Sequence, residues 1–228
     1  MNTRPANVSE LQTEPHTGLL FRLVQPAPTQ AKRLVILLHG VGTQETDMAD
    51  LAQGMAADTL VLLVRGPLTL SPGQFAWFRL SFTGSGPVIQ AQEAEHSRLA
   101  LIKFVQQIQR RYNIAPANTV LAGFSQGGIM SASVALSTPA LVAGFGLLSG
   151  RILPELEPQL ANPTQLAKLQ AFVSHGVQDN TLPVAWAHRS DALLTTLGVN
   201  HTLRLYLIGH GISPAVHTDF LSWLSALV

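Results

Sequence analysis

Short apolar runs alternate along the chain with longer stretches of helical periodicity. Leu34–Leu38 and Leu60–Val64 are apolar at every position, which is typical of strands buried on both faces of a sheet. Similar but weaker runs predict the other strands, at Leu19–Val24, Thr119–Ala122, Ala143–Leu148, Ala171–Ser174 and Leu203–Leu207. Because strands alternate with helices, we expect βαβ units, and hence an α/β fold with a mostly parallel central sheet of about seven strands and helices on both faces.

The helices are predicted between these runs. The longest, Val88–Tyr112, has an apolar stripe at three-residue steps that we expect to face the sheet, formed by Leu99, Ile102, Val105 and Ile108. Other helices are expected at Glu45–Ala56, from after Ser125 to Ser137, at Pro183–Leu197 and at Ala215–Leu227. We interpret Leu68–Pro87, dense in Gly, Pro and Ser, as irregular, and Ile152–Thr164 as an excursion between strands.

Length and composition narrow the class of protein. A chain of 228 residues suits a single domain spanning 1–228 with a substantial core. The net charge of +1, without a run of Lys or Arg, predicts no general attraction to nucleic acid. No apolar stretch approaches the roughly 18 residues of a spanning helix, so we expect no stable membrane insertion. With no cysteine, disulfides and thiolate chemistry are excluded, and a cytoplasmic location is the default. The oligomeric state is left open.

A candidate nucleophile follows the predicted strand Thr119–Ala122. Gly123-Phe124-Ser125-Gln126-Gly127 fits the pattern G-x-S-x-G, with a strand before it and a helix after it. Such a tight turn requires small residues two positions before and two positions after the nucleophile, and Gly123 and Gly127 meet that need. The alternative is a glycine-rich turn with an incidental serine. We favour Ser125 as the nucleophile.

A serine nucleophile needs a base and an orienting carboxylate, which in this arrangement follow in the order Ser, acid, His. His210 lies in a Gly-His-Gly turn just past the last predicted strand, where a loop would meet the serine turn. His217, at the start of the last helix, is the competing base. Asp179 follows the strand ending near Ser174 and is the preferred acid, although it could instead cap the next helix.

Backbone donors for an oxyanion are expected at a second strand end. Leu37-Leu38-His39-Gly40-Val41-Gly42 closes a buried strand with a His-Gly turn, where such enzymes supply one N–H group, alongside the amide of the residue after the nucleophile. We assign these donors to Val41 and Gln126. His39 is interpreted as a residue that holds this loop, and a plain strand-to-loop turn is the alternative.

Together these motifs resemble the phospholipase/carboxylesterase family, which includes bacterial carboxylesterases akin to acyl-protein thioesterases. The matching segments are LLHGVG at 37–42, WF at 77–78, GFSQGG at 123–128, LLSG at 147–150, HGVQD at 175–179 with Pro183, and GHGIS at 209–213. The resemblance implies an α/β-hydrolase fold, a triad of Ser125, Asp179 and His210, and Val41 and Gln126 as oxyanion donors. Arg79 stands where the family commonly has an acidic residue.

The expected activity is acyl transfer from a small ester or thioester to water, through an acyl-enzyme and without a metal or cofactor. Trp77 and Phe78 are candidates for the wall of the acyl pocket, and packing of their loop onto the core is an equal alternative. The rival functions are an acyl-protein thioesterase or lysophospholipase, and a non-catalytic binding protein on the same scaffold. A peptidase has no supporting feature.

Overall fold

The computed structural model describes residues 7–83 and 86–227. The ends of the predicted domain, residues 1–6 and Val228, lie outside the described part, as do residues 84–85 of the predicted irregular stretch. The strands are β1 Gln12–Thr13, β2 Leu20–Leu23, β3 Arg33–Leu38, β4 Thr59–Val64, β5 Leu68–Ser71, β6 Gln74–Ala76, β7 Leu80–Thr83, β8 Gly86–Ile89, β9 Thr119–Phe124, β10 Gly144–Leu148, β11 Gln170–Gly176 and β12 Asn200–Tyr206. The α-helices are α1 Ala91–Tyr112, α2 Gln126–Ser137, α3 Pro163–Leu166, α4 Ala185–Thr196 and α5 Pro214–Ala226, and the 3-10 helices are η1 Glu45–Ala52, η2 Pro116–Asn118, η3 Pro139–Leu141 and η4 Pro154–Gln159.

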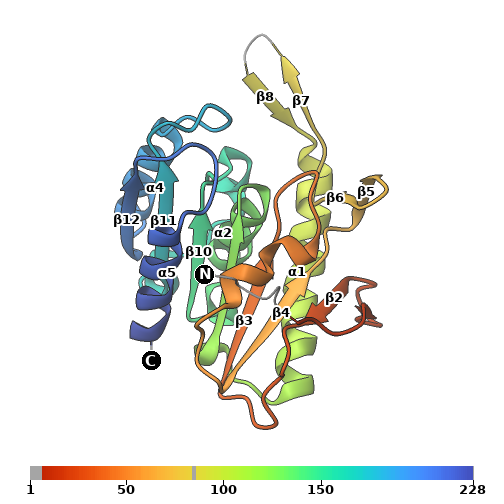
Figure 1. Ribbon diagram of the computed structural model, residues 1–228. Helices are drawn as coiled ribbons and strands as arrows, with labels where there is room; N and C mark the ends of the chain where they lie inside the picture. Colours follow the sequence, from red (N-terminus) through yellow and green to blue (C-terminus); the bar gives the residue numbers. More distant parts are fainter. Residues whose placement is uncertain (1–6, 84–85, 228) are drawn as a thin grey trace.

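A central sheet organises the fold (Figure 1). Within residues 7–83 and 86–227 it contains eight strands, in the order β1-β2-β4-β3-β9-β10-β11-β12. The strands from β4 to β12 in this order are parallel, whereas β1 and β2 join antiparallel at one edge. The predicted α/β architecture with a mostly parallel sheet is therefore confirmed, and the short edge strand β1 is an addition to it.

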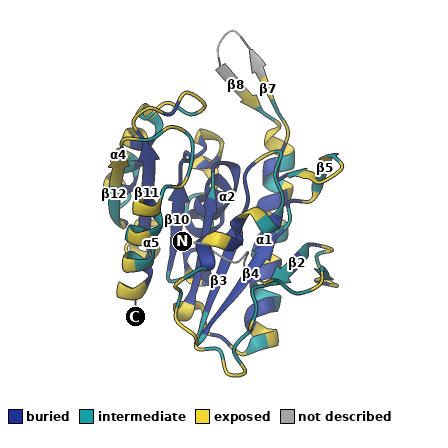
Figure 2. Cartoon of the chain, in the orientation of Figure 1, coloured by how far each residue is buried: buried dark blue, intermediate teal, exposed yellow. Residues whose placement is uncertain are grey.

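The central strands of the sheet are buried on both faces, as the apolar runs predict. Along β3, Leu34 and Ile36 belong to the core shared with α1, α2 and α4, whereas Val35 and Leu37 belong to the core shared with η1 and α5. This alternation follows from the two-residue period of a strand. Figure 2 shows this burial along β3, β4 and β10, whereas β12 at the edge is a mixture of intermediate and exposed residues.

Two helix predictions need correction. The segment Glu45–Ala56 forms a 3-10 helix that ends at Ala52, followed by a turn at Gly54 with positive φ. The helix predicted from Val88 begins at Ala91, because Val88 and Ile89 pair with β7 in a hairpin.

The buried stripe of α1 also differs from the predicted one. It consists of Leu101, Phe104, Val105 and Ile108. Leu99 is 43% exposed. A three-residue step falls about 60° short of a full helical turn, so a stripe with only this spacing winds off the face that meets the sheet.

The stretch expected to be irregular is partly ordered. Leu68–Ser71 pairs with Gln74–Ala76, across a turn in which Gly73 has φ of 75°. A second hairpin pairs Leu80–Thr83 with Gly86–Ile89 and projects from the body of the molecule (Figure 1). No helix in the described part carries an apolar segment long enough to cross a bilayer.

Candidate active site

Ser125 lies on the turn between β9 and α2. Its backbone has φ of 52° and ψ of −117°, a conformation that is uncommon for a residue with a side chain. Its amide donates to the carbonyl oxygen of Leu148 at the end of β10, over 2.8 Å. The strained turn is therefore tied to the neighbouring strand, and α2 begins at the next residue.

The glycines around Ser125 are required by backbone contacts. A Cβ atom at Gly123 would lie 2.3 Å from the carbonyl carbon of Gly127. A Cβ atom at Gly127 would lie 2.0 Å from the carbonyl oxygen of Leu38, on β3. Both distances are far inside van der Waals contact with backbone, which cannot move aside. The G-x-S-x-G pattern thus has a steric cause in this fold.

His210 reaches Ser125 from the loop after β12. Its Nε2 lies 3.0 Å from the Ser125 Oγ, and its ring packs on Phe124 with centroids 4.8 Å apart. The competing base, His217, lies in the first turn of α5 and makes no hydrogen bond to Ser125 among the described contacts. Of the candidate histidines, the structure therefore brings His210 to the serine.

Asp179 holds the other side of the imidazole. Its Oδ2 accepts from the His210 Nδ1 over 2.7 Å, and its side chain has no exposed surface. Its Oδ1 accepts from the backbone amides of Thr181 and Leu182, at 2.9 and 2.8 Å. These amides fix the carboxylate, so the imidazole is held with Nε2 free to accept from a hydroxyl.

A second histidine faces the same carboxylate. The Nε2 of His175, which is buried, donates to the carbonyl oxygen of Leu182 over 2.7 Å and lies 3.3 Å from the Asp179 Oδ2. It therefore ties together the two ends of the loop that carries the acid. This contact agrees with its interpretation as a loop residue.

The two expected oxyanion donors lie beside Ser125. Val41 and Gln126 both line a cavity of about 400 Å³ onto which Ser125 also opens, and which we name the Ser125 cavity. Within residues 7–83 and 86–227, neither backbone amide donates to another group of the protein. The two residues that line this cavity beside Ser125 thus each have a backbone N–H group without an acceptor in the described part of the chain.

A buried histidine holds the loop that carries Val41. The Nδ1 of His39 donates to the carbonyl oxygen of Gly40 over 2.7 Å, and its Nε2 accepts from the amide of Gly66 over 2.8 Å. Burial lowers the pKa of the His39 imidazole, which favours the neutral form that can both donate and accept. His39 thus ties the loop that follows β3 to the backbone that follows β4.

The aromatic pair after β6 is divided between two roles. Phe78 lines the Ser125 cavity, whereas Trp77 is not among the lining residues and is buried with its ring against that of His39. The indole N–H of Trp77 donates to the carbonyl oxygen of His39 over 2.9 Å. The expectation that both residues form the pocket wall therefore fits the geometry of Phe78, and the packing alternative fits Trp77.

Sequence reasoning missed the side chain of Gln126. Its Oε1 accepts from the amide of Trp77 over 2.7 Å, and its Nε2 donates to the carbonyl oxygen of Phe78 over 2.7 Å. It therefore pins the aromatic loop to the start of α2. The motif G-x-S-x-G leaves this position free, so the pattern itself carried no signal for such a contact.

Within the described residues, no cluster of metal ligands accompanies this site, and the nearby carboxylate of Glu45 is bonded to arginines. No group of three His, Asp or Glu side chains within the described residues is arranged to hold a metal ion. The buried carboxylate of Glu45, which follows the oxyanion loop, accepts hydrogen bonds from Arg22 and Arg65 at 2.6–2.8 Å. Burial alone would raise the pKa of Glu45, but the hydrogen bonds from the two arginines outweigh this effect, so the pKa is lowered overall. The carboxylate is therefore ionised and bound to these arginines.

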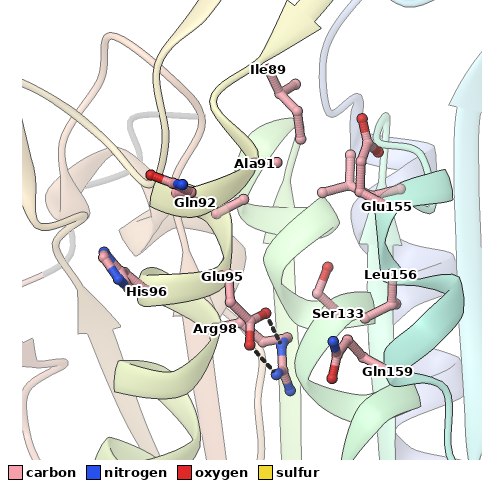
Figure 3. Close-up of a pocket in the computed structure, with 12 residues that line it drawn as sticks. Ile89, Ala91, Gln92, Glu95, His96, Arg98, Ser133, Glu155, Leu156 and Gln159 are labelled. Carbon is pink, nitrogen blue, oxygen red and sulfur yellow. Dashed lines mark hydrogen bonds and ion pairs between the residues drawn. The ribbon is translucent and has the colours of Figure 1, made fainter.

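Another cavity, of about 310 Å³, lies between α1, α2 and η4 (Figure 3). Its lining includes Ser133, His96, Glu95 and Arg98, and we name it the Ser133 cavity. The Ser133 hydroxyl donates to the carbonyl oxygen of Ile129 in its own helix over 2.8 Å. Glu95 pairs with Arg98, as the dashed lines in Figure 3 mark. Among the described residues of this cavity, the serine is therefore bonded to its own helix and is not activated by a base.

Comparison with known proteins agrees with the motifs and the fold. A family described as Phospholipase/Carboxylesterase matches residues 21–228. An acyl-protein thioesterase 1 of Gibberella zeae is 26% identical over 87% of this chain and 92% of its own length. An esterase of Escherichia coli, YpfH, is 27% identical over 83% and 81%, respectively.

A solved structure shares the fold. The carboxylesterase of Bacillus cereus aligns with a TM-score of 0.78 at 23% identity, covering 92% of this chain and 95% of its own. At this identity the likeness concerns the fold alone, but the family match extends over nearly the whole chain. The chain therefore belongs to the phospholipase/carboxylesterase family.

Proposed function

We propose that Ser125, His210 and Asp179 form the catalytic triad of an enzyme that hydrolyses carboxylic esters with short to medium acyl chains. Membership of the family makes the protein a carboxylesterase-type serine hydrolase. The observation that carries the assignment of residues is the continuous chain of hydrogen bonds, 3.0 Å from Ser125 to His210 and 2.7 Å from His210 to Asp179.

The proposed reaction proceeds in two acyl-transfer steps. The Ser125 Oγ attacks the ester carbonyl while the His210 Nε2 accepts its proton, and Asp179 stabilises the resulting imidazolium. His210 then protonates the leaving alcohol as the bond from carbon to oxygen breaks. Water, deprotonated by the same imidazole, attacks the acyl-enzyme and releases the carboxylic acid and Ser125.

The negative charge that develops on the carbonyl oxygen needs fixed donors. We assign this role to the amides of Val41 and Gln126, because both line the Ser125 cavity and neither has another acceptor in the described part of the chain. Loss of one such donor typically costs about 3 kcal/mol of transition-state stabilisation. The hydrogen bonds of His39 support the assignment, since they fix the loop on which Val41 lies.

The size and lining of the Ser125 cavity support the choice of substrate. A volume of about 400 Å³ lies at the small end of ligand pockets, which suits a short to medium acyl chain. The Gibberella zeae relative bears the name acyl-protein thioesterase, so thioester cleavage is the second candidate.

We further propose a cytoplasmic location, because a chain without cysteine has no disulfide to form in an oxidising compartment.

Hydrolysis of 4-nitrophenyl esters from acetate to palmitate tests the proposal. We expect the highest kcat/KM with short or medium chains, and no activity above background with Ser125→Ala. A fluorophosphonate should label the wild type at Ser125, whereas a binding protein on this scaffold would not react. Palmitoyl thioester as the best substrate would favour the thioesterase alternative. Unlabelled, inactive wild type would refute the proposal.

A further inference from the structure

Arg151 is a buried cation that opens onto the Ser125 cavity. It lines that cavity together with Ser125, although only 6% of its surface is exposed. A buried arginine is normally paired with an acid, because five N–H donors and a full charge are costly to desolvate. Within residues 7–83 and 86–227, the Arg151 side chain has no ion-pair or hydrogen-bond partner in the protein.

The neighbours of this guanidinium leave its charge uncompensated. It stacks on the indole of Trp186, 4.5 Å from the ring centroid, and Arg189 stacks on the same indole at 4.7 Å. Burial lowers the pKa of Arg151, and the exposed carboxylate of Glu155 acts in the opposite direction without forming an ion pair. Arginine stays charged under these conditions, since its ordinary pKa lies far above neutral pH.

The backbone fixes Arg151 next to the nucleophile. A Cβ atom at Gly150 would lie 3.0 Å from the carbonyl oxygen of Ser125, so the loop after β10 passes directly over the serine turn. Ser149, with φ of 49°, donates its amide to Ser174, and the amide of Ile152 donates to Ser190 on α4. The residue between these anchors is therefore held in place on both sides.

No acidic residue among those described as lining the cavity offsets the charge of Arg151. Arg79 also lines it, but Arg79 is ion-paired with Glu93, which neutralises its charge. No Asp or Glu is among the residues described as lining the cavity. The wall is otherwise apolar, with Leu70, Phe78 and Ile129 among its residues. Arg151 is therefore the one lining cation in the described part whose charge lacks a protein partner.

From this arrangement we propose that Arg151 binds an anionic group of the substrate, and that the preferred esters carry a carboxylate or phosphate on a short arm from the scissile carbonyl. This inference rests on the proposed hydrolase function of Ser125. A guanidinium can bind a carboxylate or a phosphate through two parallel hydrogen bonds. Arg151 positions the substrate and determines specificity, and it takes no part in proton transfer.

The test compares two esters that differ in one charge. Mono-4-nitrophenyl glutarate carries a free carboxylate, and its methyl ester is the neutral counterpart with the same acyl chain. The ratio of their kcat/KM values does not depend on the fraction of active enzyme. We expect the wild type to prefer the charged ester and Arg151→Gln to lower this ratio about 10- to 100-fold, as loss of a charged hydrogen-bond partner predicts.

Matched variants separate specificity from folding. Arg189→Gln removes the other guanidinium that stacks on Trp186, and Arg189 does not line the cavity. We therefore expect this variant to keep the ratio of kcat/KM values within about twofold of the wild type. Arg151→Lys keeps the charge without the planar fork, so its ratio should lie above that of Arg151→Gln. Inhibition of the neutral reaction by free glutarate and by inorganic phosphate shows which anion binds more tightly.

An unchanged ratio in Arg151→Gln, with both esters still cleaved through Ser125, overturns the role of Arg151 and leaves the hydrolase intact. Equal loss with both esters assigns Arg151 a structural role, stacking on Trp186, and also overturns the proposal. Failure of the wild type to cleave either ester or to react with fluorophosphonate refutes the function of Ser125 itself.

Discussion

The Ser125 cavity and the Ser133 cavity are built from similar residue types. Each is lined by a serine and an arginine, and each has a histidine and a carboxylate close by: His210 and Asp179 for the first, His96 and Glu95 for the second. In the first, the serine, histidine and acid form one hydrogen-bonded chain. In the second, the serine bonds to its own helix and the acid bonds to the arginine.

The difference comes from the backbone at the two serines. Ser133 lies inside α2, where a hydroxyl can donate to the carbonyl four residues earlier. Ser125 lies just before α2, in a turn with positive φ, so its hydroxyl is presented to His210 instead. Suitable residue types around a cavity therefore do not suffice for an active site. The backbone must also keep the serine hydroxyl from donating to a carbonyl of its own helix.

The largest effect is expected from Ser125→Ala. Without the attacking oxygen, kcat for 4-nitrophenyl butyrate should fall on the order of 10⁵- to 10⁶-fold. Ser133→Ala, the matched change in the other cavity, should leave kcat within about twofold. The comparison between the cavities fails if Ser133→Ala is as inactive as Ser125→Ala.

Next in size is Asp179→Asn. The amide can no longer hold the imidazole in the tautomer that accepts from Ser125, so kcat should drop about 10⁴-fold. Glu95→Gln, which alters the carboxylate of the Ser133 cavity, is the control and should keep full activity. Retention of more than a tenth of wild-type kcat by Asp179→Asn contradicts an orienting role for that carboxylate.

A smaller effect, on stability, is expected from Gln126→Ala. It leaves the amide of Trp77 and the carbonyl of Phe78 buried without partners, at about 1–3 kcal/mol each. Urea unfolding should show a loss of about 2–4 kcal/mol. Gln92→Ala, at an exposed position of the Ser133 cavity, should change the free energy of unfolding by less than about 0.5 kcal/mol. Equal stability of the two variants would refute the bridging role.

The smallest effect concerns pH. Burial places the native pKa of His39 below the value of about 6.5 in the unfolded chain, so the unfolded state takes up a proton first as the pH falls. Stability contributed by neutral His39 is complete above about pH 6.5 and declines below it. Unfolding curves at pH 7.5 and 5.5 should show a smaller pH-dependent loss for His39→Gln than for the wild type. His96→Gln, exposed in the Ser133 cavity, should behave as the wild type.

The features that sequence predicted best are local or depend on chain order. The turn at Ser125 needs only adjacent glycines, and the placement of Asp179 and His210 needs only the ends of two later strands. The sequence could not predict that Phe78 lines the cavity while Trp77 packs in the core. That difference depends on a hydrogen bond from Trp77 to His39, 38 residues away. Residue types alone would not have separated the Ser133 cavity from the Ser125 cavity.

The proposed base is attached to an edge strand of the sheet that contributes little to the core. β12 is at the edge, pairs only with β11, and has no buried residue among its seven described positions. Fraying of such an edge requires far less free energy than global unfolding. On heating, catalytic turnover should therefore be lost while most of the sheet is still intact. Thermal inactivation would then report local unfolding of β12 rather than global unfolding.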